Sequence, residues 1–140
     1  MRPELSARCN SIEEAYEFTL AYAAQGLESD QGSGSGTQLR EFLRRSDDAL
    51  TGLADLFRRI VAAEHLQPAD RYHAFIDVLD RDAHDAQAAI QLVLAQPAIS
   101  SQLVDNLNAS IHLRALLTDL FLIDEILKTQ TAETRPTSNP

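Results

Sequence analysis

A row of histidine and aspartate side chains runs along residues 68–95 at the spacing of one helical face. Its members are Asp70, His73, Asp77, Asp80, His84 and Gln87. Steps of three and four residues place them on one side of a helix. Imidazole nitrogens and carboxylate oxygens one turn apart are ligands for divalent metals such as Fe, Mn or Zn. One interpretation is therefore a metal site built from His73, Asp77, Asp80 and His84, with Glu64 as a further ligand.

The most specific pattern for such a site is missing from this sequence. Ferritin-like carboxylate bundles combine Glu-x-x-His pairs on two helices with a Glu from each of two others. The nearest match here is Asp70 followed by His73, and Glu-x-x-His does not occur in the chain. We therefore expect the row to be a solvated helix flank with local ion pairs. A ferritin-like metal-binding bundle remains the alternative.

Two charged residues fall on otherwise apolar stripes. Glu64 continues the apolar face of residues 37–66, and Arg114 lies near an apolar face of the last helix. An unpaired charge is costly to bury. We therefore predict that Glu64 and Arg114 form an ion pair that fixes the register of the two helices.

Composition favours some classes of partner and disfavours others. The net charge is −9, with 12 basic against 21 acidic residues. Such a surface repels phosphate backbones and anionic membranes, so we expect neither nucleic acid nor membrane as a partner. The most apolar window, 113–127, is interrupted by charges. No secretory signal is visible, and the single Cys9 suits a reducing compartment, so we predict a cytoplasmic protein.

Other catalytic templates fail. The glycines of residues 32–36 lack the lysine and the strand-to-helix context of a phosphate-binding loop. Nothing near Cys9 would activate its thiol, and no nucleophile elbow frames a serine. We therefore predict no catalytic residue and no cofactor-binding residue. A small apolar ligand between the helices, near Tyr16 and Tyr22, is a further possibility.

The elements that must position these residues are all helical. Ser11 and Glu14 form a capping box for a first helix that stops at Gly26. Long apolar stripes predict three further helices. Their ranges are 37–66, 68–95 and about 100–128, and Gly52 is a weak point in the first of the three. Short connections make neighbouring helices antiparallel, so we predict an all-α, antiparallel four-helix bundle.

The flanks and one connection have the composition of flexible chain. We expect residues 1–10 to be a disordered lead-in and residues 129–140 a disordered polar tail, which leaves 11–128 as the bundle. Residues 27–36 contain alternating glycine and serine and predict a flexible linker. The run is either natural or an engineered spacer. A loose linker would let the first helix pack on its own chain or on a neighbouring copy.

The last helix carries more apolar surface than one interface needs. Leu103, Leu107, Leu117 and Phe121 line one face, and Leu113, Leu116, Leu120, Ile123 and Leu127 line a second. Leu122 and Ile126 widen the apolar arc further. A helix that is apolar on two sides is buried on both, or it drives association. We predict a homodimer in which the second face, Leu113 to Leu127, forms the interface.

Together these features favour a non-enzymatic interaction protein or accessory subunit. Its expected partners are a second copy of the chain and a further protein.

Overall fold

The computed structural model describes residues 1–134, and every regular element in that range is an α-helix. The described helices are α1 (Arg2–Ala24), α2 (Gly34–Leu50), α3 (Leu53–Ala63), α4 (Ala69–Leu94), α5 (Ser101–Ala109) and α6 (Ile111–Thr134). The prediction of an all-α chain is confirmed, but the structure has six helices in this range where four were predicted. The predicted tail 129–140 is helical as far as Thr134, and its remainder lies outside the described residues.

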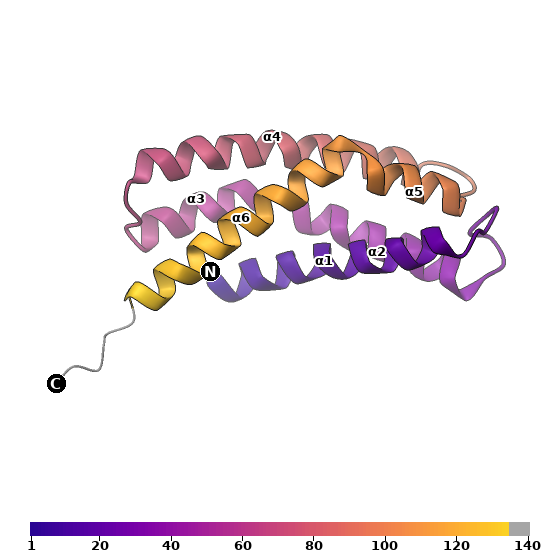
Figure 1. The fold of residues 1–140 in the computed structure, drawn as a ribbon, viewed down its shortest axis with the longest axis horizontal. Coiled ribbons are helices and arrows are strands. Elements are labelled where there is room, and N and C mark those ends of the chain that lie inside the picture. The colour runs from indigo at the N-terminus through magenta and orange to yellow at the C-terminus, as the bar shows by residue number, and fades with distance from the viewer. Residues whose placement is uncertain (135–140) are drawn as a thin grey trace.

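The predicted helix 37–66 is divided into α2 and α3 at Gly52. Thr51 is extended, and Gly52 has a φ of 72°, in the left-handed region. Glycine adopts this conformation without steric cost, so the position that sequence marked as weak is where the helix breaks. The two helices still follow one another in nearly the same direction (Figure 1).

The predicted helix from about residue 100 to 128 is divided at Ser110. This residue is extended, and its hydroxyl accepts a hydrogen bond from the Leu113 N–H at 3.3 Å. That geometry is an N-cap, which ends α5 and starts α6 in a new direction. Figure 1 shows α6 crossing the molecule obliquely and diverging from α4 towards the start of α4.

The first helix begins at Arg2, nine residues earlier than Ser11, so the expected lead-in is helical. Pro3 suits the first turn of a helix because its missing N–H would have no partner there. Leu5 is buried in the core, and Arg2 forms an ion pair with Glu64 at the end of α3. These long-range contacts explain the earlier start.

The connection 27–36 is anchored, which corrects the expectation of a loose linker. Asp30 is buried, accepts a hydrogen bond from the Ile99 N–H at 2.7 Å and pairs with Arg40 at 2.5 Å. Ser33 caps α2. A Cβ on Gly36 would overlap the Asp30 carbonyl oxygen, so glycine is required there.

The helices pack around one continuous apolar core. α1 packs on α2, α3 and α5, while α4 packs on α2, α3, α5 and α6. The largest fully buried side chains come from α1, α2, α3, α4 and the segment before α5, and include Tyr22, Phe57, Ile76 and Ile99. Among the helices described between residues 1 and 134, none combines the length and the hydropathy that crossing a membrane requires.

Candidate interaction surface

The polar row of α4 faces α3 and is tied to it by Arg58. The Arg58 guanidinium lies 3.0 Å from Asp77 and 3.6 Å from Asp80, and it also pairs with Asp55 within α3. Its hydrogen bond to Asp77 raises the pKa of Arg58 above its ordinary value. His84 pairs with Asp80 at 3.2 Å. A guanidinium therefore occupies the position between the carboxylates where a metal ion would need to lie.

The remaining predicted ligands do not join this row. His73 is exposed, and Glu64 is bound by Arg2 through two bonds of 2.7 and 2.5 Å. This hydrogen bonding by Arg2 lowers the pKa of Glu64 below its ordinary value. Within residues 1–134, no three His, Cys, Asp or Glu side chains are grouped so that they could hold a metal ion.

The predicted pairing of Glu64 with Arg114 is wrong. Arg2, at the start of α1, takes the place of the expected partner. Arg114 is exposed and lines a surface hollow with Asp119 instead. The prediction failed because it treated residues 1–10 as disordered, which removed Arg2 from consideration.

The five residues predicted for a dimer interface lie in the core of the single chain. Leu113, Leu116, Leu120, Ile123 and Leu127 are all buried. This face of α6 is the one turned towards α4 and the rest of the core, so it is not available to a second copy. We therefore correct the interface set. The exposed apolar residues of this stretch of α6 are Phe121, Leu122 and Ile126.

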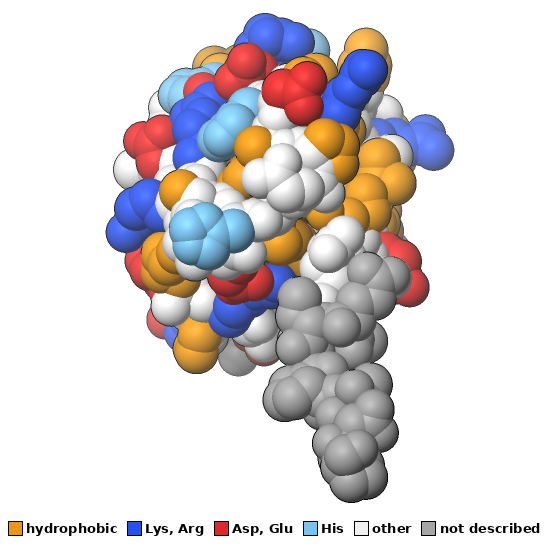
Figure 2. Space-filling view, turned by 90° about the vertical axis from the view of Figure 1, so that its left-hand side faces the viewer, with side chains coloured by type: hydrophobic (Ala, Val, Ile, Leu, Met, Phe, Trp, Pro, Cys, Tyr) orange, Lys and Arg blue, Asp and Glu red, His pale blue; other side chains and the backbone are white. Residues whose placement is uncertain are grey.

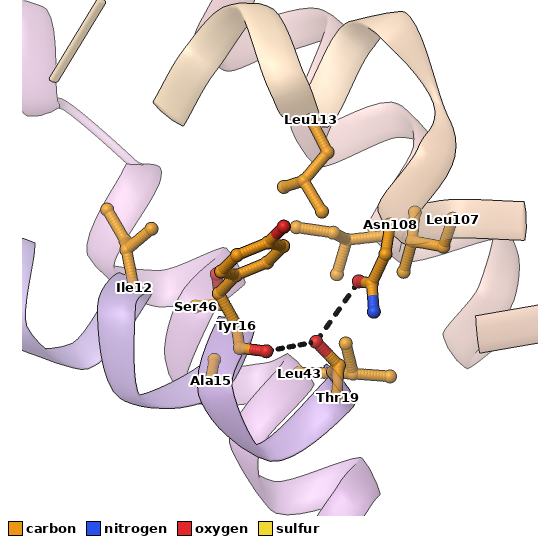
Figure 3. Close-up of a pocket in the computed structure, with 10 residues that line it drawn as sticks. Ile12, Ala15, Tyr16, Thr19, Leu43, Ser46, Leu107, Asn108 and Leu113 are labelled. Atoms are coloured by element: carbon orange, nitrogen blue, oxygen red, sulfur yellow. Dashed lines mark hydrogen bonds between the residues drawn. The ribbon is translucent and has the colours of Figure 1, made fainter. Parts of the chain in front are cut away.

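A small, mainly apolar pocket lies in the interior between α1, α2, α4, α5 and α6. Thr19 lies 2.8 Å from the carbonyl oxygen of Tyr16 and 3.1 Å from Oδ1 of Asn108 (Figure 3). The pocket measures about 20 Å³, which is room for roughly one water molecule. Tyr22 is buried and donates its hydroxyl to the Ile99 carbonyl. This pocket therefore has no room for the apolar ligand that the sequence left open.

A larger and open groove lies between the first half of α4 and the second half of α6. Its half-buried and exposed lining residues are Pro68, Arg71, Tyr72, Phe75, Leu122 and Ile126. The groove encloses about 340 Å³ and lies where the two helices diverge (Figure 1). Leu122 is 51% exposed and Ile126 39%. Figure 2 looks onto the end where α4 begins and shows hydrophobic side chains exposed among the charged ones.

A carboxyl pair lies beyond one end of this groove. Asp119 of α6 is only 8% exposed, and its side chain shares a hydrogen bond with Asp82 of α4, which requires a proton on one of the two carboxyl groups. When both groups are ionised, the Oδ2 atom of Asp119 has no donor within the described chain. Burial, reinforced by the neighbouring Asp82, raises the pKa of Asp119 to about 7. Near neutral pH this carboxyl group is therefore protonated in a substantial fraction of the molecules.

The opposite end of the groove carries a positive charge. Arg71 lines the groove, is exposed, and makes no ion pair with any side chain of residues 1–130. The groove therefore has an apolar centre with opposite charges at its two ends.

Cys9 has the environment of a structural thiol. The residue is half-buried, and burial, with Asp124 and Glu13 nearby, raises its pKa to about 12. A thiol of this kind is protonated at neutral pH and is a poor nucleophile. Nothing in the described structure points to covalent catalysis at this residue.

Sequence reasoning missed most of the groove and the carboxyl pair. The apolar arc predicted for the last helix did include Leu122 and Ile126. The interface, however, was assigned to the neighbouring face from Leu113 to Leu127, which the chain itself buries. In the sequence, Asp119 is only one of the charges that interrupt the apolar window 113–127. Its partner Asp82 is brought to it by the packing of α6 on α4, which no local pattern reveals.

Comparison of this chain with protein-family models, with curated proteins and with solved structures gave no match.

Proposed function

We propose that this chain is a non-enzymatic interaction protein that pairs with a second copy of itself through the α4–α6 groove. The observation that carries the proposal is the groove itself, with Leu122, Ile126 and the ring of Phe75 left partly open to solvent. Exposed apolar surface of this kind, bordered by polar residues, is typical of interaction sites.

The charges at the ends of the groove favour a second copy as the occupant. In a two-fold dimer the same surface is used by both chains in opposite orientations. Arg71 at one end would then approach the acidic end of the second copy, where Asp82 lies, and the reverse contact would form as well. A surface with opposite charges at its two ends is therefore complementary to its own inverted copy.

The proposed architecture supports this use of α4 and α6. We treat α2 with α3, and α5 with α6, as two broken long helices, so that the chain follows the course of an antiparallel four-helix bundle. In such a bundle every helix keeps an outward side. The outward sides of α4 and α6 are the ones that a second bundle would cover, which would give a pair of bundles packed side by side.

The first test is the native mass of the protein from micromolar to millimolar concentration, measured by sedimentation or native mass spectrometry. We expect a concentration-dependent dimer. The double variant Leu122→Glu with Ile126→Glu should be a folded monomer, because it places two charges in the apolar contact.

Leu92→Glu is the matched control, because Leu92 is an exposed leucine of α4 that does not line the groove. This variant should dimerise like the wild type. A wild-type protein that stays monomeric throughout, or a double variant that dimerises as tightly as the control, would show that the proposal is wrong.

A further inference from the structure

One ridge of α4 has a spacing that reads the same in both directions. Arg71, Phe75, Val78 and Asp82 follow one another in steps of four, three and four residues. Eleven residues make three helical turns, so Arg71 and Asp82 lie on the same side of α4 about 16 Å apart. The two charged residues stand at the ends and the two apolar residues in the middle.

The ridge lies on the side of α4 that borders the groove. Arg71 and Phe75 line the groove, Val78 is exposed, and Asp82 faces Asp119 of α6. Arg71 makes no ion pair with a side chain of residues 1–130, and neither carboxyl group of the Asp82–Asp119 pair has an ion pair with a cation in the same range. Within the described residues, each end of the ridge therefore carries a charge without an oppositely charged partner.

Resting on the proposed function, we infer that two copies pair through this ridge in antiparallel register, with Arg71 of each copy bound to Asp82 of the other. The two-fold axis then passes between Phe75 and Val78, midway between Arg71 and Asp82. The apolar side chains meet at the axis, and two identical ion pairs close the ends. The site at each end is complete only when the second copy supplies its guanidinium.

The chemistry of the acidic end suits a guanidinium. Arginine presents several N–H donors in a planar fork that matches carboxylate oxygens. Asp82 is half-buried and is the member of the pair that a second chain can reach, whereas Asp119 is almost wholly covered. A cation at Asp82 offsets the repulsion between the two carboxylates, so both can be ionised in the dimer.

The test is an exchange of charges between two chains. Arg71→Glu alone places two acids opposite each other at both ends of the dimer, and Asp82→Arg alone places two guanidinium groups there. Each variant should dimerise at least about 100-fold more weakly than the wild type, because like charges then face each other at both ends of the contact. Mixed in equal amounts, the two variants should form a heterodimer, since both ends then carry opposite charges.

Arg81→Glu is the matched control for the change in net charge. Arg81 is an exposed arginine of α4 that does not line the groove, so its substitution should leave the dimer unchanged. Circular dichroism verifies that each variant is folded.

The outcomes separate this inference from the proposed function. If Arg71→Glu dimerises like Arg81→Glu, or if the mixture forms no heterodimer, the ridge pairing is wrong. The dimer proposal survives that result provided that Leu122→Glu with Ile126→Glu still abolishes association. A wild-type monomer at millimolar concentration overturns both.

Discussion

Replacing Asp119 by Asn should stabilise the protein at alkaline pH and leave it almost unchanged in acid. The pKa of Asp119 is about 7 in the folded chain, whereas the ordinary pKa of an aspartate is 3.8, so the two differ by about three units. The folded state therefore binds more protons than the unfolded state between about pH 4 and pH 7. The stabilising effect of this proton is complete below pH 4 and is lost as the pH rises through 7.

Three units at 1.36 kcal/mol each give an upper bound of about 4 kcal/mol of lost stability by pH 8. Asparagine carries no charge at any pH, and its amide can donate to the Asp82 carboxylate in place of the shared proton. The hollow around Asp119 is otherwise lined by Ala109 of α5 and by α6 residues that include Arg114. The variant should therefore exceed the wild type by up to about 4 kcal/mol at pH 8.

The assay is urea unfolding followed by circular dichroism between pH 4 and pH 8, with the difference between variant and wild type as the quantity of interest. Both proteins should carry Leu122→Glu and Ile126→Glu, so that association does not add to the measured stability. Exposed Asp105 supplies the control Asp105→Asn. A stability difference that is the same at pH 4 and pH 8, or an Asp119→Asn variant that is less stable at pH 8, would refute the reasoning.

Three further predictions concern the interior. Gly36→Ala should lower the free energy of unfolding by several kcal/mol, because a Cβ there overlaps the Asp30 carbonyl; a thermal melt like that of wild type would contradict the close approach. Leu56→Ala should cost about 2–5 kcal/mol in urea unfolding, since Leu56 is fully buried, and a smaller loss would mean that the core closes over the cavity. Cys9 should react with a disulfide reagent much more slowly in native buffer than in urea at pH 8, because its pKa is about 12, and equal rates would show that the thiol is accessible.

The helices were predictable because apolar periodicity is a local property of the chain. The single long helix α4 agrees within a few residues with the predicted range 68–95. The breaks at Gly52 and Ser110 also have local causes, a left-handed φ and a serine cap. Sequence identified Gly52 as weak but could not decide whether packing would hold the helix together across it.

Contacts between distant residues account for the larger errors. Arg2 and Asp30 sit in segments whose composition resembles flexible chain, yet each is fixed by a partner far away in sequence, Glu64 and Ile99 respectively. Burial alone would raise the pKa of Asp30, but Arg40 and the Ile99 N–H lower it below the ordinary value. Because Asp30 is held by both of these partners, the connection 27–36 before α2 is an ordered part of the fold.

The two apolar faces of the last helix show why the site was misplaced. Leucine is equally suited to a core and to an interface, so a helix that is apolar on several sides does not reveal which side its own chain will cover. Packing of α6 on α4 settles the matter by burying Leu116 and Leu120 and leaving Leu122 and Ile126 at the groove.

The sequence contains the symmetric ridge of α4 on the same helix as the polar row from which a metal site was predicted. The ridge and the polar row lie on different sides of α4, and a different helix packs beside each of them. The polar row lies against α3, where Arg58 neutralises it. The ridge lies beside α6, where neither Arg71 nor Asp82 has an oppositely charged partner among residues 1–130. A charge that its own chain has already paired gives little free energy to a second molecule, whereas an unpaired charge beside exposed apolar surface does. The arrangement of ion pairs therefore directs the search for a partner to the α6 side of α4.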